Sequence, residues 1–240
     1  MARRGESKTQ KSISAPIIRH FNRKETVFTV KGRPGPHSNG TSVPLSFLLR
    51  EVLGVASTVK ECKKILSEGS VKINGKQRKK LEFPAGIFDL VEIAPIKKKY
   101  RLLLDTKGRL KAKEIDYKAA DFKVSKIVAK RAVKGGKIML TTNDGYSLDM
   151  GSQKIQVDDS VKLSLPALKI EAVYGPEKGN TAFLVAGVHV GKTLKVEGVV
   201  PGDTNKEKSV TLSEEGKQFE TVLRNVFVVG KEKAEIEALK

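Results

Sequence analysis

The sequence of 240 residues contains no Trp, one Cys, three His and only 5% aromatic residues. The single cysteine, Cys62, excludes an intramolecular disulfide and is typical of a protein from a reducing compartment. His20, His37 and His189 lie far apart in the sequence, so no metal-ligand spacing is present. We therefore expect small aliphatic cores, no metal and no cofactor.

Long apolar runs are also absent. No segment approaches the roughly 18–20 apolar residues that a membrane-spanning helix requires. Residues 1–8 are polar and lack the apolar stretch of a signal peptide. These features predict a soluble, cytoplasmic protein with no membrane partner.

Positive charge is what the sequence has in excess. Lys and Arg number 46 against 27 Asp and Glu, for a formal net charge of +19. Residues 1–137 hold 33 basic and 12 acidic residues, whereas residues 138–240 hold 13 and 15. Each cation that meets a phosphate releases condensed counterions, so an uneven excess of this kind predicts a nucleic-acid surface in the first 137 residues.

Residues 1–42 are basic and rich in glycine and proline, with 9 basic and 2 acidic residues. This composition predicts an extended N-terminal arm that folds against RNA; the alternative is a disordered tail. His37, in a Gly/Pro loop, is a candidate for base stacking or phosphate contact, or else a surface histidine without a role. The candidate RNA contacts of the arm are Arg3, Arg4, Arg19, Arg23, Lys24, Arg33 and His37.

Residues 43–96 predict two short helices packed on a small sheet. Leucines at positions 45, 48 and 49 form an apolar stripe with helical spacing, which Gly54 ends. Thr58 and Glu61 have the spacing of a capping box that opens a second helix. Asn74-Gly75 is a strong hairpin signal, and residues 88–93 read as a returning strand.

The rest of the chain predicts short strands separated by turns. Residues 97–170 read as a central β domain, and the lysines at 97–99 mark its junction with the preceding unit. Residues 171–240, punctuated by glycines, read as a small β-barrel of five or six strands. The fold class is therefore α+β and multidomain, with a basic arm, a helix–helix–hairpin unit and two small antiparallel β domains.

Lysines gather on the second predicted helix. Lys60, Lys63 and Lys64 share one face, because positions i, i+3 and i+4 are neighbours on a helix. A solvated helix face is the alternative, but residues 60–80 hold eight basic residues against two acidic ones. We therefore predict RNA contact. The further candidates are Arg50, Lys72, Lys76 and Arg78 in this unit, and Arg109, Lys130 and Arg131 in the central β domain.

The lysine-rich helix followed by the sequence GSVKING at residues 69–75 resembles the S-four-type RNA-binding module. That module occurs in small-subunit ribosomal proteins, pseudouridine synthases and tyrosyl-tRNA synthetases. PGPH at residues 34–37 lies upstream, and Gly179-Asn180, residues 187–191 and residues 225–230 resemble a KOW motif. With these features nearly the whole chain resembles the archaeal and eukaryotic ribosomal protein family S-four-e.

This resemblance implies a structural constituent of the small ribosomal subunit. Its partners would be small-subunit ribosomal RNA and neighbouring ribosomal proteins, and no homo-oligomer is expected. The last segment is acidic overall and has few basic residues around its glycines, which leaves RNA and protein open as its partner.

Two other functions are possible from the sequence. A pseudouridine synthase needs an aspartate nucleophile, often within Gly-Arg-Leu-Asp, whereas this chain has Lys111 after Gly108-Arg109-Leu110. A lysine cannot supply that carboxylate, so we predict no enzymatic activity. The second alternative is a free translation or transcription factor built on a KOW barrel.

Overall fold

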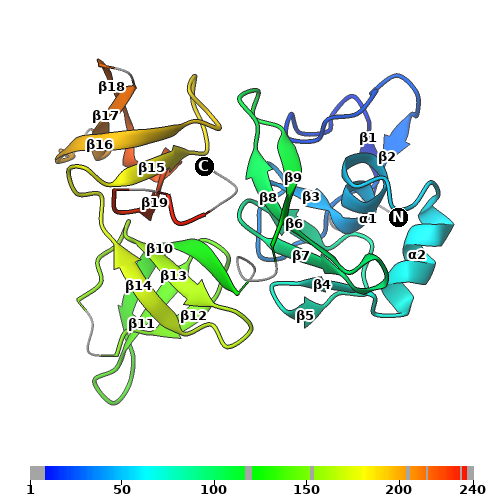
Figure 1. Cartoon of the computed structure of the whole chain (residues 1–240), viewed down its shortest axis with the longest axis horizontal. Helices are drawn as coiled ribbons and strands as arrows, with labels where there is room; N and C mark the ends of the chain where they lie inside the picture. The colour runs from blue at the N-terminus through cyan, green and yellow to red at the C-terminus, as the bar shows by residue number, and fades with distance from the viewer. Residues whose placement is uncertain are drawn as a thin grey trace, which may run out of the picture.

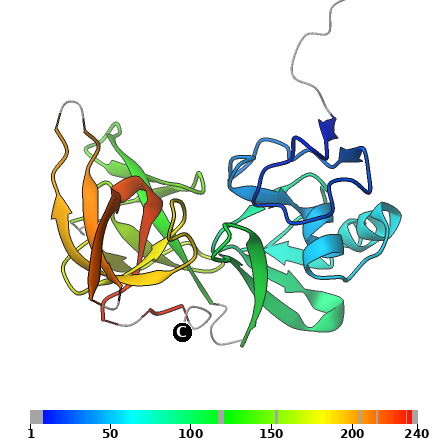
Figure 2. The ribbon, with the colours of Figure 1, turned by 90° about the horizontal axis from the view of Figure 1, so that it is seen from above.

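The computed structural model describes residues 9–116, 121–151, 154–203, 206–214, 216–232 and 234–236. Its framework is three five-stranded antiparallel sheets. The first sheet and the helices form one half of the molecule, and the other two sheets form the second half (Figures 1 and 2). The family of shapes that the sequence predicts, few helices and many antiparallel strands, is confirmed.

Three sheets of five strands each make up the framework, with neighbouring strands named in succession. The module sheet is β5 (Lys76–Gln77), β4 (Val71–Ile73), β7 (Leu90–Ile93), β8 (Lys98–Leu104) and β9 (Leu110–Ile115). The central sheet is β12 (Ser147–Asp149), β11 (Ile138–Thr142), β10 (Phe122–Ala132), β13 (Ser160–Ser164) and β14 (Ile170–Tyr174). The C-terminal sheet is β18 (Lys217–Val222), β17 (Ser209–Glu214), β16 (Thr193–Val200), β15 (Thr181–Leu184) and β19 (Val226–Gly230).

Smaller elements surround the module sheet. Two short pairs of strands are β1 (Gln10–Lys11) with β2 (Phe28–Thr29), and β3 (Ser42–Pro44) with β6 (Pro84–Gly86). The helices are α1 (Leu45–Phe47), the π-helical turn η1 (Leu48–Val52) and α2 (Val59–Ser67). The 3₁₀ turns are η2 (Ala94–Ile96) and η4 (Leu223–Asn225).

The local signals of the helical region are confirmed. Leu45, Leu48 and Leu49 are fully buried along α1 and η1. At the start of α2 the Glu61 amide donates to the Thr58 hydroxyl at 3.2 Å, and the Glu61 carboxylate accepts from the Thr58 amide. These bonds satisfy amides that the first turn of a helix leaves without partners. Asn74 and Gly75, with φ of +50° and +77°, make the predicted hairpin turn between β4 and β5.

The boundary expected between residues 96 and 97 lies inside the module sheet. β7 and β8 are antiparallel neighbours, with Val91 opposite Tyr100, and β9 extends the same sheet. The turn η2 reverses the chain directly, so β8 covers the edge that β7 would otherwise leave open. The boundary expected at residue 170 also falls within a strand, because β14 pairs with β13.

Residues 9–42 are packed on the module and do not form an extended arm. The Leu110 amide donates to the Ile18 carbonyl at 3.0 Å, and the Arg33 amide donates to the Glu82 carbonyl at 2.9 Å. The ring of Phe21 lies edge-on to that of Phe47, with 5.4 Å between their centroids. Apolar contacts that are remote in sequence therefore order this segment without RNA. Arg3 and Arg4 lie outside the described residues.

The three sheets form one body because their interfaces are buried. Phe88 of the module is fully buried, and its ring lies 5.5 Å from Phe183 and 5.6 Å from Phe227 of the C-terminal sheet. The Val228 amide of the C-terminal sheet donates to the Ser160 hydroxyl of the central sheet at 3.0 Å. Contacts of both apolar and polar kinds therefore hold the sheets against one another.

Replacing Phe88 by alanine tests the aromatic interface. Phe88→Ala leaves a cavity between the module and the C-terminal sheet, so we expect the free energy of unfolding to fall by about 3–5 kcal/mol. Phe28→Ala is the matched control, because Phe28 is 58% exposed and its removal should change stability by less than about 0.5 kcal/mol. Urea denaturation measures both, and equal changes in the two variants would contradict the shared core.

Candidate RNA-contact surface

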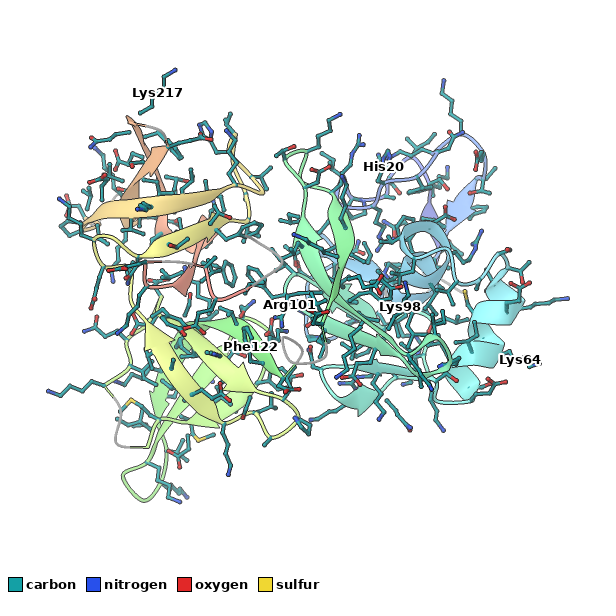
Figure 3. All side chains as sticks on the ribbon, in the orientation of Figure 1. His20, Lys64, Lys98, Arg101, Phe122 and Lys217 are labelled. Carbon is teal, nitrogen blue, oxygen red and sulfur yellow. The ribbon has the colours of Figure 1, made fainter. Side chains whose placement is uncertain are left out.

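Helix α2 separates its apolar and basic faces. Cys62 and Leu66 are fully buried against the module, while Lys60, Lys63 and Lys64 are exposed. Figure 3 shows Lys64 at the outer end of the module, directed away from the protein. Three ammonium groups therefore lie together on the outward face of this helix.

A second group of lysines lies across the module sheet. Lys72, Lys97, Lys98 and Lys99 line a shallow hollow of about 180 Å³ together with Glu92. Lys98 pairs with Glu114 at 2.9 Å, and Lys99 pairs with Glu92 at 3.3 Å. Sequence reasoning assigned residues 97–99 to a junction and missed this cluster, although three consecutive lysines were a visible signal.

Two predicted contacts from the β4–β5 hairpin are engaged with aromatic rings. The Lys76 ammonium lies 5.8 Å from the centre of the Tyr146 ring, and the Arg78 guanidinium lies 4.4 Å from that of Phe83. Such cation–π contacts leave part of each cation accessible. Lys76 is exposed and Arg78 is half-buried.

The other predicted cations are spread over the surface and are partly engaged with the protein. Arg23 donates to the Ile13 and Pro16 carbonyls, and Arg33 lies 4.0 Å from Glu82. Arg50 donates to the Ser57 carbonyl and pairs with Glu51. The remaining positions are Lys24, exposed; Arg109, 3.4 Å from His20; Lys130, which donates to the Ile155 carbonyl; and Arg131, exposed.

The structure corrects the prediction for Arg19, which is 1% exposed. Its guanidinium donates to the Gln10 side chain at 3.0 Å, the Val30 carbonyl at 2.9 Å and the Asn39 side chain at 2.6 Å. Burial lowers its pKa to about 10, so it stays charged at neutral pH. Arg19 holds residues 9–42 together and does not reach phosphate.

His37 is likewise buried, at 8% exposed, and the prediction of a base or phosphate contact is wrong. Its Nε2 lies 3.0 Å from the Asp89 carboxylate, and its Nδ1 lies 3.7 Å from that of Asp144. Gly86 packs so closely that a Cβ there would stand 2.4 Å from the His37 ring. Only glycine fits against the imidazole at this position.

Lys123 completes this buried ionic network, which we define as His37, Asp89, Lys123 and Asp144. The Lys123 ammonium lies 2.5 Å from Asp89 of the module and 2.7 Å from Asp144 of the central sheet. Asn74 donates to the Asp89 carboxylate at 2.8 Å. The network therefore joins the module to the central sheet with charges that have no access to solvent.

The residues around the network satisfy its carboxylates. The Gly86 amide donates to Asp89 at 2.8 Å, and the Ser125 hydroxyl donates to Asp144 at 2.6 Å. Burial opposes the charge on Asp89, but the Lys123 ammonium and His37 outweigh it and hold the pKa of Asp89 well below its usual range. None of these residues lines a described cleft. The network is therefore closed to any substrate.

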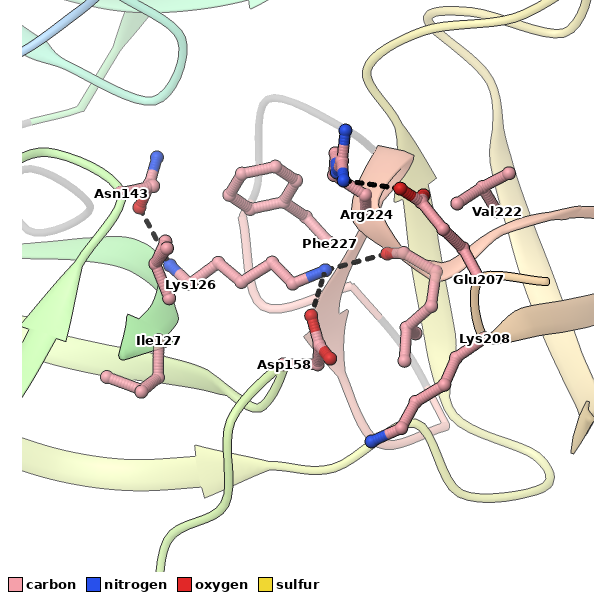
Figure 4. A pocket seen from close by; sticks show the side chains of 11 residues that line it. Lys126, Ile127, Asn143, Asp158, Glu207, Lys208, Val222, Arg224 and Phe227 are labelled. Carbon is pink, nitrogen blue, oxygen red and sulfur yellow. Dashed lines mark hydrogen bonds and ion pairs between the residues drawn. The ribbon is translucent and has the colours of Figure 1, made fainter. Parts of the chain in front are cut away.

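The largest cleft of the described residues, about 470 Å³, lies between the central and C-terminal sheets (Figure 4). The Lys126 ammonium donates to the Leu223 carbonyl at 2.6 Å and pairs with Asp158 at 3.2 Å. Arg224 pairs with Glu207 at 2.5 Å. No Ser, Thr, Cys or His is among the described residues that line this cleft, so it holds no nucleophile with an adjacent base.

Within the described ranges, no group of three or more His, Cys, Asp or Glu side chains is arranged to hold a metal ion. Among the helices of those same ranges, none has the length and apolar character needed to cross a membrane.

Comparison with known proteins places the chain in a family. A model of the ribosomal family S4e matches residues 96–170, and an S4 domain model matches residues 46–91. The small ribosomal subunit protein eS4 of Methanosphaera stadtmanae is 35% identical over 233 residues, which cover 97% of this chain and 96% of the relative. The chain belongs to the eS4 family. The eS4 protein of Archaeoglobus fulgidus is 36% identical over 222 residues, or 92% of this chain and 93% of the relative.

A solved structure agrees with this eS4 assignment. The crystal structure of the 30S ribosomal protein S4e from Thermoplasma acidophilum superimposes with a TM-score of 0.69 at 29% identity. The match covers 80% of this chain and 96% of that one. The resemblance expected from residues 69–75 and the glycine-rich C-terminal segments is thereby confirmed at the level of the eS4 family.

Removing the cation of the network tests its energetic weight. Lys123→Met leaves two buried carboxylates without their ammonium, so we expect the free energy of unfolding to fall by about 3–5 kcal/mol. Lys63→Met is the matched control, because the same replacement on the exposed face of α2 should cost less than about 0.5 kcal/mol. Guanidinium denaturation compares them; a destabilisation at Lys123 within error of that at Lys63 would refute the role of the network.

The network also predicts how stability depends on pH. Because the pKa of Asp89 is lowered on folding, its contribution is complete above the pKa of an unfolded aspartate, about 3.9, and is lost as the pH falls below that value. We expect the unfolding free energy of the wild type to fall between about pH 5 and pH 2. In Asp89→Asn this acid dependence should be shallower, and parallel curves for the two proteins would contradict the prediction.

Proposed function

We propose that the protein is a structural constituent of the small ribosomal subunit that binds ribosomal RNA and stabilises its fold. Membership of the eS4 family supports the assembly, since the relatives carry that name. The outward lysine face of α2 is the observation that carries the RNA contact. Its location would be the cytoplasm, on the ribosome.

The proposed mechanism is neutralisation of phosphate charge. Lysines on a rigid face lower the repulsion between RNA segments, and binding releases their counterions. Such contacts read the shape of folded RNA more than its base sequence. The proposed contacts are Lys60, Lys63 and Lys64 at the centre, with Arg50, Lys72, Lys76, Arg78 and residues 97–99 beside them. The outlying contacts are Arg3, Arg4, Arg23, Lys24, Arg33, Arg109, Lys130 and Arg131.

The C-terminal sheet is proposed to face protein more than RNA. Residues 138–240 hold 13 basic and 15 acidic residues, which gives little attraction for phosphate. We propose that this sheet is the KOW-like barrel of the chain and that neighbouring small-subunit proteins pack against it. The proposed division of the chain is then residues 9–115, 122–174 and 181–230, one part for each sheet.

We also propose that the protein has no catalytic activity. Lys111, at the position where a pseudouridine synthase would carry its aspartate, pairs with Asp105 at 2.9 Å on the exposed end of β8 and β9. An ammonium in an ion pair is neither the nucleophile nor the base of that reaction. Assay of uridine isomerisation tests this statement directly, and any turnover would contradict it.

Charge removal on α2 tests the RNA contact. The triple variant K60A/K63A/K64A should weaken binding to small-subunit RNA and reduce the salt slope of log Kd by about two to three, roughly one for each phosphate that is no longer neutralised. The control K178A/K195A/K217A removes the same charge from exposed sites of the C-terminal half. Equal effects in the two variants would mean that net charge alone governs binding.

Ribosome association needs a separate measurement. Co-sedimentation with small subunits through high-salt gradients should retain the protein, because a structural constituent is held by many contacts. A free translation or transcription factor would dissociate under these conditions, and complete loss of the protein from the subunit fraction would favour that alternative.

A further inference from the structure

The hairpin of residues 128–138 extends beyond the central sheet. β10 pairs with β13 only over Phe122 to Lys126 and with β11 over the remainder, with a register shift between Ile127 and Ala129. β12 pairs with β11 over Met139 to Thr141, so it does not cover the hairpin. Figure 1 shows the resulting two-stranded ribbon projecting at the lower left.

The composition of this hairpin is one-sided. It carries Lys130, Arg131, Lys134 and Lys137 and no acidic residue, and these four cations are exposed. Gly135 and Gly136 have φ of +87° and +72°, and a Cβ on either would meet nothing within 4 Å. The glycines therefore serve the tight turn alone, and they leave a narrow tip with bare backbone.

Protection of a strand edge is the simplest alternative reading. Lysines on open edges prevent pairing with another chain. Lys134 and Lys137, however, flank the turn, where no long edge needs protection. Val128 and Val133 on the same ribbon are 56% and 48% exposed, which an edge protected against association would not display. The pattern fits a surface that is covered by a polyanion.

The buried ionic network fixes where this ribbon points. Lys123 and Ser125 lie at the start of β10, where they bind Asp89 and Asp144. The same strand then continues into the hairpin, so the anchored end determines the direction of the free end. In Figure 1 the hairpin and α2 lie toward opposite ends of the longest axis.

We propose that the hairpin of residues 128–138 is a second RNA-contacting element, and that it and α2 bind two separate segments of RNA. The partner is the phosphate backbone of a folded RNA, approached by a narrow basic ribbon. This inference rests on the proposed function and adds to it a fixed spacing between the two bound segments. The protein then acts as a brace between RNA elements.

Directed hydroxyl-radical probing tests the proposal in reconstituted small subunits. Cys62 is fully buried, and the Cys62→Ser background allows one iron chelate to be tethered at a chosen exposed site. The sites are Val133→Cys on the hairpin, Ser67→Cys at the end of α2 and Gln218→Cys on β18 as a control. We expect the Val133 and Ser67 probes to cut two non-overlapping segments of the RNA, and the control to cut neither.

The outcomes separate the two proposals. Cleavage from Ser67 without cleavage from Val133 would overturn the hairpin contact and leave the proposed function intact. Overlapping cleavage from both sites would overturn the bridging of separate segments. Absence of cleavage from both would contradict the proposed RNA contact itself and the inference with it.

Charge removal on the hairpin gives a second measurement. R131A/K134A/K137A should weaken RNA binding by roughly tenfold or more, as expected when two or three phosphates are no longer neutralised. It should remove the Val133-directed cuts and keep those from Ser67. The control K178A/K195A/K217A should change neither pattern. Wild-type affinity combined with aggregation of the hairpin variant would show that the cations only protect an edge, and would overturn the proposal.

Discussion

The arrangement of the molecule depends on one ammonium group between two carboxylates. Lys123 binds Asp89 of the module and Asp144 of the central sheet, away from solvent. Burying charges is costly unless they are paired and hydrogen-bonded, and in this network Asn74 and Ser125 supply further bonds. An apolar interface tolerates sliding, whereas these short polar contacts are satisfied in a single relative position of the two parts.

The basic residues of this chain therefore have two uses. Arg19, Arg101, Lys123 and Lys126 are buried and hold protein to protein; Arg101, for example, donates to the Phe122 carbonyl, and Figure 3 shows the two side by side. The exposed lysines of α2 and of the β10–β11 hairpin remain for RNA. Net charge alone overstates the binding surface, because it cannot distinguish an internal tie from an external contact.

The sequence predicts what depends on neighbouring residues. The capping box at Thr58 and the Asn74-Gly75 turn are local, and both are found in the structure. Sheet membership depends on partners remote in the chain, so the pairing of β8 with β7 could not be read from alternating residues. The burial of Arg19 and His37 has the same cause: each meets its partners only after folding brings them together. Of the proposed RNA contacts, those on α2 were predictable because helical spacing alone places them on one face.

The aromatic contact of Phe88 has a consequence for the order of events during synthesis. Its ring packs against Phe227 on β19, a strand that follows all strands of the other two sheets. Contacts between remote segments slow folding and leave apolar surface exposed in the meantime. The module therefore presents its lysines before its core is closed, and a newly made chain meets RNA or aggregation partners first as a basic, incompletely packed domain.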